Sequence, residues 1–149
     1  METITEKLSE KLNDLLEKTY DAEKGFKKAA ENVEHAGLKA YFEEKADQRY
    51  NFGHELKKEI RAIGGEVDKG GSAMGTAHRT WMDIKAFLSL DSEESMLEEA
   101  IRGEKAAIDD YEDVLEEATL PPSTKAIITS QKLMIQNGLS NIKKMEDLR

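Results

Sequence analysis

The stretch DSEESMLEEAIRGEKAAIDDYEDVLEEA, residues 91–118, decides the fold of this chain. Its apolar positions recur at alternating steps of three and four residues, which is the pattern of one buried face of an α-helix. These positions are Leu97, Ile101, Ile108, Tyr111 and Leu115. Between Ile101 and Ile108, the same face holds Glu104 instead of an apolar residue. Because an isolated buried charge is very costly, Glu104 is expected to have a partner or to be protonated.

Three more long amphipathic helices are predicted from the same spacing, over residues 4–34, 38–63 and 123–148. A short helix is expected over residues 76–89. Asp91 is expected to cap the helix of the quoted stretch, with Glu94 three residues later as in a capping box. Residues 64–77 hold five glycines and form a longer connection than compact domains usually contain. Four long helices with one long crossover, between the second and the third, predict an all-α four-helix bundle, with residues 1–149 as a single domain.

Polar residues interrupt the apolar stripes of three helices near their midpoints. They are Arg49 on the second helix, Glu104 on the third and Gln131 on the fourth. The planar fork of arginine matches a carboxylate bidentately, which predicts a buried ion pair between Arg49 and Glu104. Gln131, Glu23 and Tyr111 are expected to complete a structural polar network that fixes the helix register.

The alternative interpretation is a metal site for iron or manganese with a reduced ligand set. A di-iron bundle uses a glutamate from each of two helices and a Glu-x-x-His motif from each of the other two. The candidate ligands would be Glu23, Glu55, Glu104 and His54. However, Ala107 stands where a histidine would have to follow Glu104, and Arg49 places a positive charge near the cation. Because this is a poor ligand set, we predict no metal or other cofactor and assign no catalytic or cofactor-binding residue.

The net charge of −9 is concentrated in the quoted stretch, where twelve acidic residues and two basic ones give −10. This distribution argues against nucleic acid as a partner, since binding phosphates requires a basic surface. No apolar run approaches the roughly 20 residues of a membrane span, and the first residues lack the apolar core of a signal peptide. The chain has no cysteine, which excludes disulfides and thiolate chemistry. A cytoplasmic protein that does not bind membranes is expected.

The segments GGEVDKGGSAMGTAHRTWMDIK, residues 64–85, and RGEKAAIDDYEDVL, residues 102–115, closely resemble an uncharacterised bacterial family of ferritin-like four-helix-bundle proteins, catalogued as a domain of unknown function. The crossover motif of that family is matched at His78, Arg79, Trp81 and Lys85. The resemblance implies the ferritin-like bundle fold over nearly the whole chain but no established activity. A family histidine is expected near Gly138 and Leu139, where this chain has none.

These observations favour a non-catalytic cytoplasmic bundle that acts through its surface or by self-association. The resemblance suggests a role in stress physiology. A metal-binding or oxidase protein remains the alternative. Three apolar residues off the main stripes, Leu16, Tyr41 and Leu139, suggest a homodimer. The sequence does not identify a protein partner.

Overall fold

The computed structural model describes residues 3–67, 92–144 and 147–148 of the chain. Within these residues it contains four α-helices and no strand: α1 (Ile4–Asn32), α2 (Ala36–Ala62), α5 (Glu93–Leu115) and α6 (Pro122–Asn141). The predicted all-α architecture with four long helices is therefore confirmed. The short helix expected over residues 76–89, and the crossover motif of His78, Arg79, Trp81 and Lys85, lie outside the described residues.

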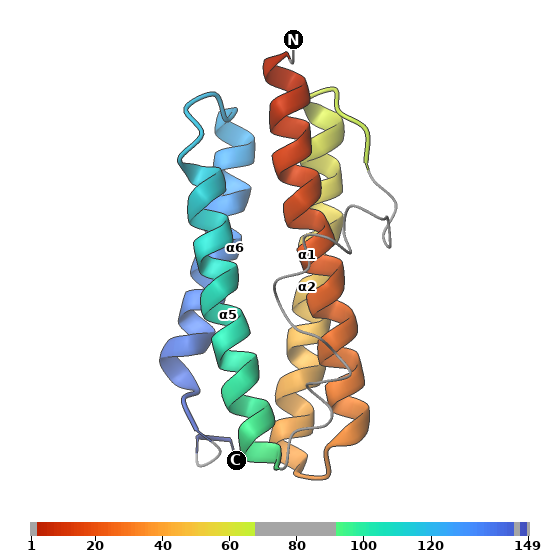
Figure 1. Cartoon of the computed structure of the whole chain (residues 1–149), viewed down its shortest axis with the longest axis vertical. Helices are drawn as coiled ribbons and strands as arrows, with labels where there is room; N and C mark the ends of the chain where they lie inside the picture. The colour runs from red at the N-terminus through yellow and green to blue at the C-terminus, as the bar shows by residue number, and fades with distance from the viewer. Residues whose placement is uncertain (1–2, 68–91, 145–146, 149) are drawn as a thin grey trace.

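The helices form two antiparallel pairs, α1 with α2 and α5 with α6 (Figure 1). The pairs meet through α1 against α5 and through α2 against α6, so that α2 and α5 lie diagonally across the bundle. Figure 1 also shows that α2 and α5 run in the same direction. The end of α2 and the start of α5 therefore lie at opposite ends of the bundle.

The start of α5 and the end of α6 differ from the predicted positions, because hydrogen bonds of nearby side chains fix these ends. The Ser92 side chain caps α5 by accepting a hydrogen bond from the Ser95 N–H, so the cap is Ser92 and not Asp91. Helix α6 ends at Asn141, seven residues before the predicted end at residue 148. Here the Asp147 carboxylate accepts hydrogen bonds from the backbone N–H groups of Lys143, at 2.9 Å, and Lys144, at 3.2 Å. These bonds stabilise a turn that a continued helix could not contain.

The core consists of two apolar clusters, one in each half of the bundle. The cluster around Phe26, Phe42 and Leu97 lies where α1 meets α2 and α5 begins. The second cluster contains Leu12, Leu16, Phe52, Leu56, Tyr111 and Ile128. Along three of the four helices the change from one cluster to the other coincides with a buried polar residue: Thr19, Arg49 and Glu104. A polar layer therefore separates the two apolar halves.

Two details of the predicted core are wrong. On α5 the buried apolar face is centred on Leu97, Ala100, Tyr111 and Val114, whereas Ile101, Ile108 and Leu115 are only half-buried. Apolar residues cover more than one side of α5, and the buried side also carries the small residues Ala100 and Gly103. The residues thought to lie off the main stripes also pack inside the bundle, since Leu16 and Tyr41 are buried and Leu139 is half-buried. They are therefore not evidence for a dimer.

Candidate functional site

An ion pair between α2 and α5 lies at the centre of the polar layer. The Arg49 Nη2 donates a hydrogen bond to Glu104 Oε1, and the two side chains are 2% and 1% exposed. The guanidinium contacts two aromatic rings, 5.6 Å from the centroids of both Phe26 and Phe52. Such cation–π contacts are stronger when water is excluded. The predicted buried salt bridge between Arg49 and Glu104 is confirmed.

A second cation, Lys45, approaches the other oxygen of Glu104. Its Nζ lies 3.8 Å from Glu104 Oε2, and the lysine side chain is only 7% exposed. Space for the ammonium exists because α6 has a glycine opposite it: a Cβ at Gly138 would lie 2.5 Å from Lys45 Nζ. Burial lowers the pKa of the Lys45 ammonium, an effect that the attraction of Glu104 opposes.

The sequence reasoning missed Lys45 altogether. A signal was present, because Lys45 precedes Arg49 by four residues and therefore shares its helix face. Lys45 can be buried because Gly138 of α6 lies opposite it. Which helix packs against Lys45 depends on the tertiary structure and could not be inferred from the sequence.

The other predicted polar residues form a separate group beside the ion pair. The Tyr111 hydroxyl donates to Gln131 Oε1 at 2.7 Å, and both side chains are buried. The amide Nε2 of Gln131 donates to the Phe52 carbonyl at 3.3 Å and to Glu55 Oε1 at 3.0 Å. Burial raises the pKa of the Tyr111 hydroxyl, which therefore stays protonated and acts as a donor.

Two candidate ligands lie apart from this layer. Glu23 is on the flank of α1 and pairs with Lys27 at 3.0 Å, so it does not join the polar network. His54 is exposed, and its ring meets that of Tyr50 edge-on at 4.6 Å. Glu55 is also exposed and is bound by Gln131, as described above. Within residues 3–67, 92–144 and 147–148, no group of three or more histidine, aspartate or glutamate side chains is arranged to hold a metal ion.

The donor set of the layer does not fit iron or manganese. Both oxygens of Glu104 face cationic side chains of the protein, Arg49 and Lys45. A metal cation there would have to displace a charge-assisted bond and would face two positive charges.

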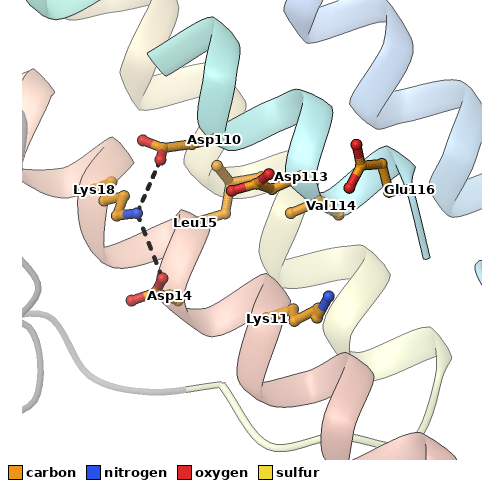
Figure 2. A pocket seen from close by; sticks show the side chains of 8 residues that line it. All are labelled: Lys11, Asp14, Leu15, Lys18, Asp110, Asp113, Val114 and Glu116. Carbon is orange, nitrogen blue, oxygen red and sulfur yellow. Dashed lines mark hydrogen bonds and ion pairs between the residues drawn. The ribbon is translucent and has the colours of Figure 1, made fainter. Parts of the chain in front are cut away.

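A shallow cavity of about 270 Å³ between α1 and α5 was not anticipated from the sequence (Figure 2). Lys18 links the two helices there, since its ammonium contacts Asp110 at 3.1 Å and Asp14 at 3.5 Å. Burial raises the pKa of the Asp110 carboxyl, and the hydrogen bond from Lys18 works against this rise. Asp113 and Glu116 also line the cavity. The ammonium of Lys18 already bridges two of the acidic residues, Asp14 and Asp110, so we assign this cavity a structural role.

No helix among the described residues is both long and apolar enough to cross a membrane. No curated protein matches the chain. A family model described as "Domain of unknown function (DUF2383)" matches residues 7–117. The match covers α1, α2 and α5, and with them Arg49, Lys45 and Glu104, whereas Gln131 and Gly138 on α6 lie beyond it. Because the match spans most of the 149 residues, the chain belongs to this family of unknown function.

Proposed function

We propose that this protein is a non-catalytic helical bundle that acts through its surface or by self-association, and that it is not a metal-dependent oxidase. One observation carries this proposal: the carboxylate at the centre of the bundle, Glu104, is neutralised by two side-chain cations, Arg49 and Lys45. In a metal-dependent bundle the inward carboxylates would face the metal ions instead. A buried ion pair of this kind specifies how helices pack and contributes little net stability.

We further infer a ferritin-like topology, in a bacterial and cytoplasmic protein with the stress-related role that the sequence resemblance suggests. The parallel directions of α2 and α5 support the topology, because they require one long crossover. The location and the role rest on the sequence resemblance and composition alone.

The surface favours a protein partner over nucleic acid. Exposed carboxylates for which the structure gives no ion pair within the described residues lie on α5 and just after its end: Glu94, Glu98, Asp109, Asp113 and Glu116. A negative surface of this kind repels phosphates. For self-association, the support is the adjacent pair Leu133 and Met134 on α6, which are 51% and 46% exposed. Light scattering over a wide concentration range tests the homodimer, and a constant monomer mass would contradict it.

Iron loading separates this proposal from the oxidase alternative. After aerobic addition of ferrous iron, we expect no ferroxidase absorbance, no stoichiometric bound iron and no rise in melting temperature. A metal present at several hundred times its dissociation constant would stabilise the fold by about 3–4 kcal/mol, which a melting curve detects easily. Bound iron that disappears in Glu104→Ala would replace our proposal with the alternative. The matched control is Glu99→Ala, which removes a half-buried carboxylate of the same helix that pairs with the exposed Arg102.

A further inference from the structure

A cavity of about 350 Å³ lies between α2 and the residues around the carboxyl end of α6, and Lys45 forms part of its wall. Its volume is within the range of small-molecule sites. The wall combines apolar groups from Tyr41, Ile142 and Leu148 with the acidic side chains of Glu44 and Asp147. Because Lys45 also contacts Glu104, the Lys45 side chain lies between this cavity and the buried layer.

The amine of Lys45 and the free oxygen of Glu104 face each other, and neither has a full set of partners. The structure gives Lys45 Nζ no hydrogen bond among the described residues, and its charged contact is Glu104 Oε2 at 3.8 Å. That oxygen is buried and accepts no hydrogen bond. Native proteins rarely leave a buried carboxylate oxygen without a donor, so this arrangement indicates that a further group can bind there.

The surroundings of Lys45 also favour its reactive form. A lysine is a nucleophile only as the neutral amine, and desolvation favours that form. Burial is the largest influence and lowers the pKa of Lys45; the carboxylates of Glu104 and Glu44 raise it, and the nearby Arg49 lowers it. The neutral amine is therefore more populated at Lys45 than at an exposed lysine.

We propose that Lys45 is a covalent binding site for small uncharged aldehydes, with which it forms a reversible imine in this cavity. The amine nitrogen attacks the carbonyl carbon and gives a carbinolamine. Loss of one water molecule then leaves the imine, so that one amine and one aldehyde yield one imine and one water. Glu104 Oε2 is placed to accept the proton from the nitrogen and to return it to the departing hydroxyl. This inference goes beyond the proposed surface role and does not depend on it.

The cavity wall sets the class of aldehyde. Tyr41, Ile142 and Leu148 offer apolar surface for a short alkyl chain. Glu44 and Asp147 disfavour an aldehyde that carries a carboxylate or phosphate, because like charges repel each other.

The test is competition between lysines of the same intact protein. The protein is treated near neutral pH with butyraldehyde and cyanoborohydride, and the alkylated lysines are mapped by peptide mass spectrometry. Lys24 is the internal control, since it is exposed on α1. We expect Lys45 to be alkylated faster than Lys24, because desolvation leaves a larger fraction of Lys45 as the neutral amine. With glyoxylate, which carries a carboxylate, this preference should disappear. Slower alkylation of Lys45 than of Lys24 by butyraldehyde would overturn the proposal.

Two variants make the result specific for the site. Gly138→Ala places a Cβ against the ammonium and should bring the alkylation rate of Lys45 towards that of Lys24, while the fold is retained because a flexible side-chain end can move. Lys45→Arg keeps the positive charge but removes the nucleophile. It should therefore abolish the fast alkylation that we attribute to Lys45. A fast phase that survives in Lys45→Arg, or an unchanged Lys45 rate in Gly138→Ala, would refute the assignment.

Discussion

Replacing Glu104 with alanine tests the energetic role of the buried layer. The carboxylate is 1% exposed, and its removal leaves two cations without a counter-ion. Arg49 would keep its hydrogen bond to Gln48 and its two aromatic neighbours, whereas Lys45 would lose its charged partner. Breaking a buried pair in this way costs about 3–5 kcal/mol. For a chain of this size, that loss lowers the melting temperature by about 6–20 °C.

The assay is urea unfolding followed by circular dichroism, with a rescue series. The double variant Arg49→Met, Glu104→Leu should recover much of the loss, because apolar residues of similar volume replace both members of the pair. We expect the double variant to recover only part of the lost free energy of unfolding, because Lys45 stays buried without a counter-ion. Adding Lys45→Met should recover more of it. Glu99→Ala is the matched control: it removes an exposed ion pair with Arg102 and should change the free energy of unfolding by less than about 1 kcal/mol. If Glu104→Ala behaves like this control, the pair is not a buried element of the fold.

Two further predictions concern neighbouring groups. Tyr111→Phe removes the donor to the buried Gln131 Oε1 and should lower the free energy of unfolding by about 1–2 kcal/mol. The control Tyr50→Phe, at an exposed position, should have no measurable effect. Equal effects of the two variants in urea unfolding would contradict this prediction. Burial lowers the pKa of Lys45 in the folded state below its unfolded value of 10.5. At a pH between these two pKa values the unfolded chain binds more protons than the folded one. Lys45 should therefore make the free energy of unfolding rise with pH in this range. Lys45→Met should lack this contribution, and identical stability–pH slopes for it and the wild type would refute the assignment.

Most of the fold could be predicted because the apolar spacing of each helix is a local property of the sequence. The helices predicted over residues 4–34 and 38–63 agree with α1 and α2 to within two residues at each end. The end of α6 could not be predicted in this way, because it depends on the Asp147 carboxylate reaching back to two backbone N–H groups. The buried face of α5 was misplaced because apolar residues cover more than one side of that helix.

In the candidate site, too, the features that depend on local sequence could be predicted and those that depend on tertiary packing could not. Arg49 and Glu104 could be paired from sequence because each is a charge within an apolar stripe. Glu23 was misassigned because its position on the flank of the stripe allows a local partner, Lys27, one turn away. Lys45 was missed because its burial depends on the glycine at position 138 of α6, more than 90 residues later.

The position of the ion pair suggests why the bundle keeps charges in its core. Short turns set the register of α1 against α2 and of α5 against α6, whereas residues 63–92 separate α2 from α5 in the sequence. Polar contacts cross that gap at two heights: Arg49 binds Glu104 near mid-bundle, and the Glu93 carboxylate accepts hydrogen bonds from the N–H groups of Glu34, at 2.7 Å, and His35, at 3.2 Å. An apolar core could slide along this diagonal with little change in buried area, whereas the ion pair is satisfied in one register only. The same contact leaves Lys45 as an excess buried cation. The geometry that fixes the fold thus also creates the one amine of unusual chemistry in the described part of the bundle.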